Sequence, residues 1–529
     1  MGNGEWLIVG GNQPVTTNGV TTTPGGPDPY KDQDGGVSSR LVTPCLDESC
    51  QYSYGTIQSR RWYPTLETLA DGSVIIIGGD MYGGFVNNGP NNNPTYEFYP
   101  SRGAQQQLPI LLDTLPANLY PLTWLLPSGQ LFLQLNWGTE LFNPDTGVET
   151  RLPNVTHAVR TYPASAASAM LPLTPANNYT ATILLCGGTD LLDNQWATDN
   201  GTVLTVMTTL PAVQSCVTMT PDTDPTWHDD DDLPGGRTMG NFIILPDQTL
   251  FLCNGAKMGV AGYGTQPWVV SDSYADIPLY EPYIYDPSKP AGSRFSNEGL
   301  QNSTIARMYH STATLLPDGS VFVAGSSPHP DVVLTGPYPT EYRIERFYPW
   351  YFNKPRPFPQ GWPTSLTYGG NSFDLTLTSD DLNGDGAGAL EQTTVMLIRT
   401  GYATHAINFG QRALQLDNTY TLNDDGSAVL HVSQIPPNPS MFAPGPAWLF
   451  CVVNGVPSIG VEVVVGSGKI EVQSTLAVSP LPASKLPKGV STSNANVDPS
   501  ESAASPKAGV ASLMTMLVGA AFAAFVGAL

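Results

Sequence analysis

The chain has 529 residues, enough to bury a large core and to form two folded units followed by a tail. Only 13% of its residues are charged, and 53 Gly and 49 Pro interrupt many short apolar runs, which is typical of an all-β protein with frequent turns. The formal net charge of -23 would repel a phosphate backbone, so the composition argues against nucleic acid as a partner.

A unit made of an apolar strand and a glycine turn recurs along the chain. Its copies are LIVGG (7–11), VIIIGG (74–79), ILLCGG (183–188), FLCNG (251–255) and VFVAG (321–325), with LFLQLN (131–136) as a degenerate sixth. Several copies follow a turn such as LPDGSV (316–321). The repeats predict a kelch-like β-propeller with six countable blades, and the irregular spacing leaves room for a seventh.

The composition changes at ERFYPWYFNKPRP (345–357), where Pro and aromatic residues are dense. We therefore expect the propeller over 1–350 and a second unit over 351–467. In that second unit, runs such as SFDLTL, TTVMLIRT and AWLFCVV alternate with turn residues. This alternation is typical of a small immunoglobulin-like β-sandwich.

The tail has two parts. Residues 468–509 are rich in Ser, Pro and Ala and predict a disordered linker. Residues 510–529 are apolar, which fits either a transmembrane helix or a glycolipid-anchor signal. We favour the lipid anchor because small residues precede a polar spacer and no basic residue follows the apolar stretch. We thus expect an extracellular, cell-surface protein.

The start of the chain disagrees with this expectation. MGNGEWLIVGGN opens directly in a blade, without the charged and apolar regions of a signal peptide. Since a lipid anchor requires entry into the secretory route, we expect the sequence to be N-terminally incomplete.

Other features are consistent with secretion. Four N-glycosylation sequons are present, at Asn154, Asn178, Asn200 and Asn302. Cys45 and Cys50 flank a short acidic loop, and we expect a local disulfide there. Cys186, Cys253 and Cys451 lie in apolar runs and are interpreted as buried small hydrophobic residues.

Two of the six histidines are candidate metal ligands. His310 lies directly before a β run and directly after Tyr309, and His405 lies between two runs of the second unit. Imidazoles combined with phenolate oxygens suit a tetragonal Cu(II) site. Successive side chains of a strand point to opposite faces, so Tyr309 and His310 can share one metal only at a strand end or turn.

Four long motifs resemble the glyoxal oxidases, relatives of galactose oxidase. They are RRWYPTLETLADGSVIIIGGD (60–80), RMYHSTATLLPDGSVFVAGSSPHP (307–330), THAINFGQR (404–412) and GPAWLFCVVNGVPSIG (445–460). The resemblance covers about residues 1–465. It implies a seven-bladed propeller followed by an early-set immunoglobulin-like domain, one loop of which reaches into the propeller channel.

The resemblance also implies roles for four residues. Tyr63 matches the tyrosine that carries the radical and Tyr309 the axial tyrosine, while His310 and His405 match the two histidine ligands of one copper ion. A small aldehyde, as its hydrate, would bind the metal, and Tyr309 would accept its hydroxyl proton. The Tyr63 radical would then take a hydrogen from carbon, and O2 would be reduced to H2O2 as the carboxylic acid forms.

One family feature is missing. In these enzymes a cysteine shortly before the first GNG-type turn is joined to the radical tyrosine, but here that turn is Asn3–Gly4 and no cysteine precedes it. The chain as written would then be inactive unless the true protein begins upstream.

Alternative functions are a non-catalytic kelch-type propeller that binds the cell surface or wall, and an alcohol oxidase of the galactose oxidase type. We expect a monomer. The run HDDDD (228–232) and the aromatic segment YPWYF (348–352) are interpreted as a solvated loop and as interdomain packing.

Overall fold

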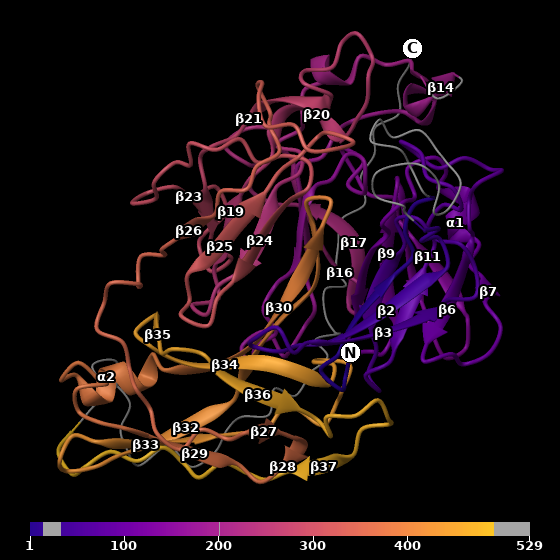
Figure 1. Ribbon diagram of the computed structural model, residues 1–529. Coiled ribbons are helices and arrows are strands. Elements are labelled where there is room, and N and C mark those ends of the chain that lie inside the picture. The colour runs from indigo at the N-terminus through magenta and orange to yellow at the C-terminus, as the bar shows by residue number, and fades with distance from the viewer. Residues whose placement is uncertain (14–32, 200–201, 491–529) are drawn as a thin grey trace, which may run out of the picture.

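The computed structural model describes residues 1–13, 33–199 and 202–490. In this part of the chain the protein is all-β, as expected, and it consists of a large ring of small sheets above a smaller pair of sheets (Figure 1). The helices are α1 (Ile110–Asp113) and α2 (Gly386–Glu391), together with 3-10 turns η1 (Asp193–Trp196) and η2 (Met207–Thr209).

Six antiparallel sheets form the propeller within the described ranges, where the resemblance implies seven. In chain order they are β1 (Trp6–Val9), β2 (Ser38–Thr43) and β3 (Gln51–Thr56); β4 (Thr65–Thr68), β5 (Val74–Ile77), β6 (Thr95–Tyr99) and β7 (Gln106–Gln107); β8 (Leu122–Leu125), β9 (Leu131–Leu135), β10 (Gly138–Phe142) and β11 (Glu149–Leu152); β12 (Ala167–Met170), β13 (Ile183–Cys186), β16 (Cys216–Thr220) and β17 (Asp224–Asp229); β18 (Asn241–Ile244), β19 (Leu250–Cys253), β22 (Tyr283–Tyr285) and β23 (Phe295–Ser296); and β24 (Ser311–Leu315), β25 (Val321–Gly325) and β26 (Glu345–Phe347).

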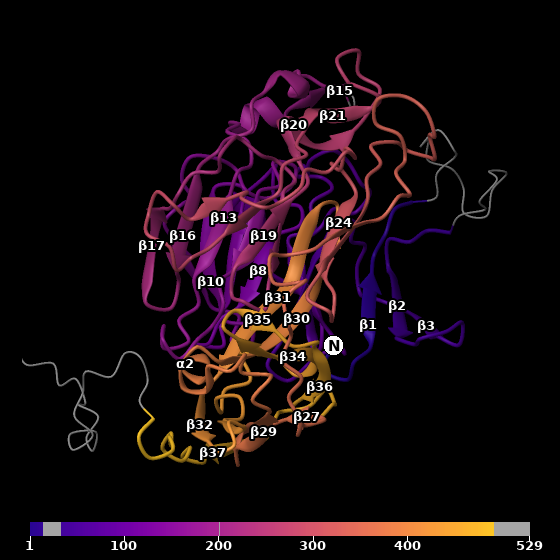
Figure 2. The ribbon, with the colours of Figure 1, turned by 90° about the vertical axis from the view of Figure 1, so that its left-hand side faces the viewer.

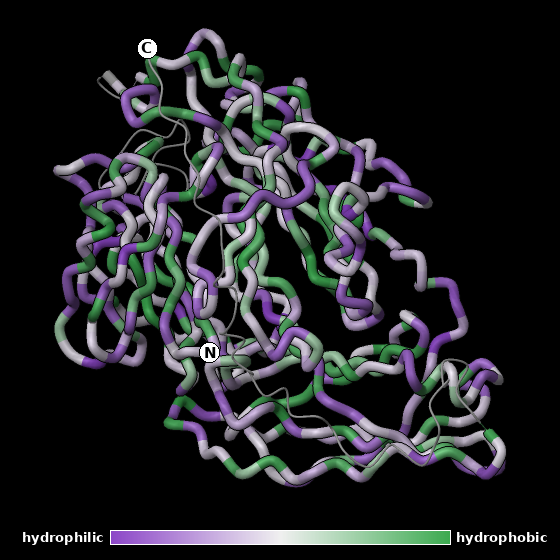
Figure 3. The backbone as a smooth tube through the Cα atoms, turned by 180° about the vertical axis from the view of Figure 1, so that it is seen from behind, coloured by the Kyte–Doolittle hydropathy of each residue, from purple (hydrophilic) through white to green (hydrophobic). Residues whose placement is uncertain are grey.

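Each copy of the repeat forms one strand of a different sheet: β1, β5, β9, β13, β19 and β25. In five sheets this strand is second in order, behind an inner strand, whereas β1 lies at the edge of its sheet. β5 and β13 are apolar throughout because neighbouring sheets cover both of their faces, and all four residues of each are buried, whereas β1 is half exposed. Figure 3 shows these hydrophobic segments running through the interior.

A buried arginine recurs just before the inner strand of four sheets. Each guanidinium donates to a carbonyl at the glycine turn that ends the second strand, in the pairs Arg61–Gly78, Arg160–Gly187, Arg237–Asn254 and Arg307–Gly325. These bonds satisfy carbonyls that the ladder cannot reach, and they tie the start of the inner strand to the turn beside it.

Glycine is required at these turns because another chain segment passes against them. Gly187 has φ +79, and a Cβ there would lie 2.0 Å from the carbonyl oxygen of Arg237 in the next sheet. Glycine thus allows adjacent blades to meet closely around the channel.

The second unit is a β-sandwich, as expected. One sheet contains β27 (Ser365–Leu366), β36 (Val461–Val465), β34 (Gly445–Val453), β30 (Thr394–Thr404) and β31 (Ile407–Leu416), with β35 (Val456–Pro457) paired to β34. The other contains β29 (Phe373–Leu377), β33 (Ala428–Val432) and β32 (Asn418–Leu422). Every pairing between these described strands is antiparallel except that of β27 with β36, and the edge strands β28 (Tyr368–Gly370) and β37 (Thr475–Val478) also pair in parallel. Two hairpins, β14 (Thr198–Asp199) with β15 (Thr202–Val203) and β20 (Ala256–Tyr263) with β21 (Ser273–Pro278), lie at the far end of the propeller (Figures 1 and 2).

The long hairpin β30–β31 leaves the sandwich and rises among the blades, as both ribbon views show (Figures 1 and 2). Inner strands β4, β8, β12, β18 and β24 all contact it. Side chains of β31 bond to the blades: Gln411 donates to the Phe242 carbonyl at 2.7 Å and Arg412 to the Leu125 carbonyl at 2.6 Å. The hairpin is therefore the loop that the resemblance placed in the channel.

The expected linker over 468–509 is wrong at its start. β37 pairs in parallel with β28, and Lys485 exchanges backbone bonds with β32. The side chains of β37 are exposed, but a sheet edge supplies backbone partners and does not require burial of side chains. Residues 491–509 and the anchor signal expected over 510–529 lie outside the described residues.

Two cysteine predictions have different outcomes. Cys45 and Cys50 form the expected disulfide, but Cys186 is bonded to Cys216 and is not a free hydrophobic residue. The two lie directly opposite each other on β13 and β16, a pairing that only the sheet register reveals. Cys253 and Cys451 are free and buried, as expected. Among the described residues, no helix is long and apolar enough to span a membrane.

Candidate metal centre

Three distant segments bring the four predicted residues together. Tyr63 lies just before β4, Tyr309 and His310 lie just before β24, and His405 lies at the tip of the β30–β31 hairpin. The Tyr63 and Tyr309 hydroxyl oxygens are 2.7 Å apart. The His405 ring centroid lies 4.1 Å from that of Tyr63 and 4.7 Å from that of His310, so the four side chains form one cluster.

The turn before β24 meets the geometric demand on Tyr309 and His310. His310 has φ +66 and lies outside the strand, which begins at Ser311. The left-handed conformation of His310 interrupts the alternation of side chains between the two faces of a strand. The Tyr309 and His310 rings therefore lie on the same side, with centroids 3.9 Å apart. Both side chains can therefore reach one ligand.

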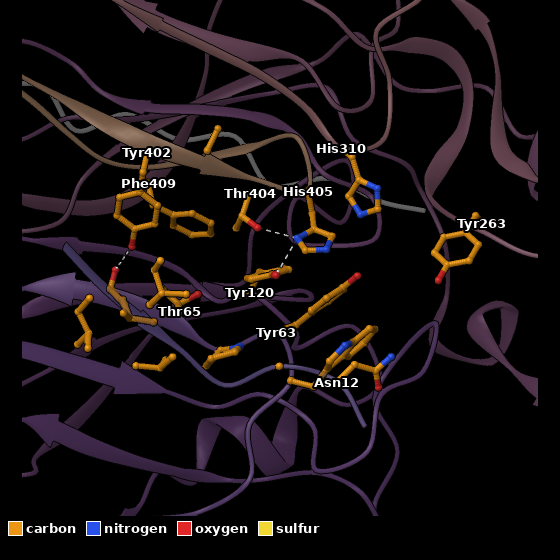
Figure 4. Close-up of a pocket in the computed structure, with 18 residues that line it drawn as sticks. Asn12, Tyr63, Thr65, Tyr120, Tyr263, His310, Tyr402, Thr404, His405 and Phe409 are labelled. Atoms are coloured by element: carbon orange, nitrogen blue, oxygen red, sulfur yellow. Dashed lines mark hydrogen bonds between the residues drawn. The ribbon is translucent and has the colours of Figure 1, made fainter. Parts of the chain in front are cut away.

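Each imidazole is held through Nδ1. His310 Nδ1 lies 2.8 Å from the Ser327 carbonyl, which can only accept, so this nitrogen carries the proton. His405 Nδ1 lies 2.8 Å from the Tyr120 hydroxyl and 2.7 Å from the Thr404 hydroxyl. The Nε2 atom of each ring is left for a ligand, and Figure 4 shows both rings and the Tyr63 hydroxyl turned toward one space.

Burial controls the charge of the cluster. It raises the pKa of the Tyr63 and Tyr309 phenols well above the usual value, since a phenolate would be poorly solvated there. Burial lowers the pKa of His310, and burial together with the nearby His310 lowers that of His405 well below the usual value. The imidazoles are thus neutral, as a metal ligand must be.

A cavity of about 540 Å³ opens onto the cluster (Figure 4). Tyr63, His310 and His405 line the cavity. Tyr309 is not among the lining residues and contacts the cluster through the hydrogen bond between its hydroxyl and that of Tyr63. The other described residues that line the cavity are apolar, aromatic or neutral polar, and no Asp, Glu, Lys or Arg is among them. Such a site suits a small uncharged molecule.

Sequence reasoning missed two aromatic residues of the site. Trp62 stacks on Tyr63 with ring centroids 3.4 Å apart, and Tyr120 stacks on the same ring at 4.5 Å. A signal was present, because Tyr–Pro precedes the inner strand in three consecutive sheets, at Tyr63, Tyr120 and Tyr162. All three tyrosines are buried around the same point.

Two other sequence features lie away from this cluster. The HDDDD run falls at the end of β17 and beyond it, where Asp230 pairs with Arg294 and Asp231 accepts backbone amides. In the aromatic segment, Trp350 donates to Asp247 and Tyr351 to the Gly319 carbonyl. Among the described residues there is no group of three or more His, Cys, Asp or Glu arranged to hold a metal.

The donor set fits a copper ion. Two imidazole nitrogens without a hydrogen-bond partner and two phenolic oxygens face one point, and nitrogen–oxygen sets of this kind favour Cu(II). The sequence offers no cysteine for the family's thioether, and the structure agrees: four of the six cysteines form disulfides, and neither Cys253 nor Cys451 lines the cavity.

Known proteins are similar to this chain in sequence and in fold. The family described as glyoxal oxidase N-terminus matches residues 10–351, and the galactose oxidase-like early set domain matches residues 356–465. Aldehyde oxidase GLOX1 of Arabidopsis thaliana is 32% identical over 86% of this chain and 70% of its own length. Aldehyde oxidase GLOX of Vitis pseudoreticulata is 33% identical over 81% of this chain and 77% of its own length.

A solved fungal alcohol oxidase in complex with copper aligns with a TM-score of 0.59 and 18% identity, over 82% of each chain. This likeness shows a common fold. Together, the propeller, the inserted hairpin and the Tyr–His cluster define the class of propeller and early-set proteins to which the oxidases belong. The chain is a member of the glyoxal oxidase family.

Proposed function

We propose that this protein is a copper radical oxidase that converts small aldehydes, of the glyoxal and methylglyoxal type, to carboxylic acids. The observation that carries the proposal is the convergence of Tyr63, Tyr309, His310 and His405 beside a cavity whose described lining carries no charged side chain. Family membership supports the same reaction class, because the relatives are named aldehyde oxidases.

Tyr63, Tyr309, His310 and His405 would hold one copper ion. The metal and a radical on Tyr63 would each accept one electron from the substrate. In the balanced reaction an aldehyde hydrate, RCH(OH)2, and O2 give RCOOH and H2O2. Two electrons and two protons pass from the hydrate to dioxygen.

The protein's own groups handle the proton and the orientation. Tyr309 Oη shares a hydrogen bond with Tyr63 Oη. Burial favours the neutral phenol, so Tyr309 would have to be ionised by a bound metal before its oxygen could accept the substrate hydroxyl proton. Trp62, stacked on Tyr63, shields that ring from water. No cationic side chain is among the described residues that line the cavity, so an anion such as glyoxylate would have only the metal as a partner. We therefore expect the neutral hydrate to be the preferred substrate.

The test measures copper content and peroxide release from the purified full chain supplied with methylglyoxal. We expect about one copper per chain, and we expect Tyr309→Phe to lower kcat by about 10²–10⁴-fold because a general base is lost. Tyr351→Phe removes the hydroxyl of a buried tyrosine outside the cavity and serves as the matched control with unchanged kcat.

Other outcomes would reassign the protein. Absence of both copper and peroxide would identify a non-catalytic propeller that binds the cell surface or wall. Oxidation of galactose in preference to methylglyoxal would identify an alcohol oxidase. Equal rates with glyoxal and glyoxylate would contradict the substrate class argued from the cavity.

We further propose that the protein acts outside the cell and is attached by a C-terminal lipid. Two disulfides are typical of an oxidising compartment, and Asn154, Asn178 and Asn302 of the sequons are exposed. Treatment of intact cells with a phosphatidylinositol-specific phospholipase C is expected to release the protein into the medium. Retention in the membrane would favour a transmembrane helix.

A further inference from the structure

His405 is held in a strained two-residue turn. Thr404 pairs with Ile407, so His405 and Ala406 form the loop, and their φ values of +51 and +63 are those of a type I′ turn. This turn favours Asn and Gly, and a His–Ala pair persists in it only where surrounding contacts fix it. One such contact fixes the backbone: Asn241 of β18 donates to the Ala406 carbonyl at 2.9 Å.

A different contact fixes the ring. The Tyr120 hydroxyl lies 2.8 Å from His405 Nδ1, and Tyr120 belongs to the propeller, just before β8. Its backbone N–H donates to the Tyr63 carbonyl at 3.0 Å, and its ring stacks on that of Tyr63. The second partner of Nδ1, Thr404, lies on the same hairpin as His405 and cannot set the ring relative to the blades.

We propose that Tyr120 is a positioning residue of the metal centre, holding the His405 imidazole so that Nε2 faces Tyr63, Tyr309 and His310. The role rests on the proposed copper site. Tyr63, Tyr309 and His310 belong to the propeller, whereas His405 belongs to the sandwich. A bond from a propeller side chain to the His405 ring therefore fixes the orientation of that ring relative to the other three ligands. With a metal on Nε2, Nδ1 carries the proton and donates it to the hydroxyl oxygen.

The two histidines differ in how firmly their tautomer is set. The carbonyl partner of His310 accepts only, so that ring presents a free Nε2 at all times. The hydroxyl partners of His405 can donate or accept, so without metal either nitrogen of this ring can carry the proton. Loss of the Tyr120 hydroxyl therefore affects His405 and spares His310.

The experiment titrates Cu(II) alone into full-length, metal-stripped protein. We expect Tyr120→Phe to weaken copper binding by about 10- to 100-fold, as for other groups that orient a ligand, and Thr404→Val to weaken it less. Tyr368→Phe is the matched control: it removes a buried tyrosine hydroxyl of the sandwich, one that donates to the Phe442 carbonyl outside the cavity, and copper affinity is expected to stay unchanged.

Electron–nuclear double resonance of the bound Cu(II) gives an independent readout. We expect two similar nitrogen couplings in the wild type and one altered coupling in Tyr120→Phe. 4-Aminophenylalanine at position 120 retains a polar group on the same ring and is expected to restore affinity, even if the Phe variant folds poorly. Wild-type affinity and couplings in a folded Tyr120→Phe would overturn the positioning role alone, whereas a wild type that binds no copper would overturn the copper site as well.

Discussion

The backbone at the metal centre is unusual at four residues. Tyr63, Tyr120, His310 and His405 have φ values between +48 and +66, a region in which side chains other than Gly, Asn and Asp are uncommon. Such conformations cost about 1–3 kcal/mol each and persist where the surrounding structure holds them. Here they turn rings from successive chain segments toward one point.

Arg61, two residues before Tyr63, is one of the contacts that hold this backbone. It is fully buried, forms an ion pair with Glu97 at 2.8 Å and donates to two backbone carbonyls. We expect Arg61→Met to lower the free energy of unfolding by about 3–5 kcal/mol, because Glu97 and the carbonyls lose their donors in a buried site. Urea denaturation measures this loss.

The control is Arg102→Met, which breaks a partly exposed pair with Asp71. Its expected effect is under about 1 kcal/mol, since water competes for exposed ion pairs. Equal losses in the two variants would contradict the argument from burial.

At the scale of elements, the β30–β31 hairpin joins the sandwich to the propeller through polar contacts as well as apolar ones. Arg412 of β31 lies 4.0 Å from Glu67 of β4, and Glu67 also accepts the Leu125 N–H at 3.3 Å. Burial raises the pKa of Glu67 to about 7, against the opposing effect of Arg412. The hairpin therefore packs on a carboxyl that resists ionisation.

This shift predicts a pH dependence of stability. Between pH 4.5 and about 7 the unfolded chain has released the Glu67 proton and the folded protein retains it, so the contribution of Glu67 falls as pH rises through this window. Glu67→Gln removes the titration, and its stability relative to the wild type is expected to rise by up to about 3 kcal/mol from pH 4.5 to pH 7. Unfolding midpoints measured across this range provide the test.

Glu48 is exposed and lies outside the hairpin contacts, and Glu48→Gln is measured alongside as the comparison variant. A constant difference for Glu67→Gln would show that Glu67 titrates normally.

At the scale of the whole molecule, the described residues cover only one face of the first sheet. Leu7 and Val9 pack toward β5, but the opposite face carries two rows of paired residues, Trp6–Val42–Tyr52 and Ile8–Arg40–Tyr54. Trp6 is 64% exposed and Tyr54 is 81% exposed. This face lies beside the open edge of β1, whose residues Leu7, Ile8 and Val9 also line the cavity.

In contrast to the monomer expected from the sequence, an apolar face next to a strand edge that has no partner among the described residues favours self-association. In sedimentation velocity we expect the apparent sedimentation coefficient of the wild type to rise with protein concentration. Trp6→Lys with Ile8→Lys is expected to abolish the rise. Leu334→Lys removes an exposed apolar side chain elsewhere and is expected to leave it unchanged. A wild type whose coefficient is independent of concentration would contradict this prediction.

Local patterns were sufficient to predict much of this architecture. Each glycine-turn repeat became a strand of its own sheet, because an apolar run followed by glycine folds the same way wherever blades stack. The Tyr309–His310 adjacency was enough to require a turn before β24, since strand alternation is a local property. The disulfide of Cys186 was missed because its partner, Cys216, is 30 residues away and only the register of β13 with β16 brings them together.

The amino-acid sequence alone determined the class of fold, the residue types available for a metal and the position of each beside a strand end, because periodicity and turn chemistry act over a few residues. Only the tertiary structure decided that Tyr63, Tyr309, His310 and His405 meet, and that Tyr120 joins them. Those contacts depend on a hairpin of the second unit crossing into the channel of the first, and no short-range preference specifies how two separately patterned units dock.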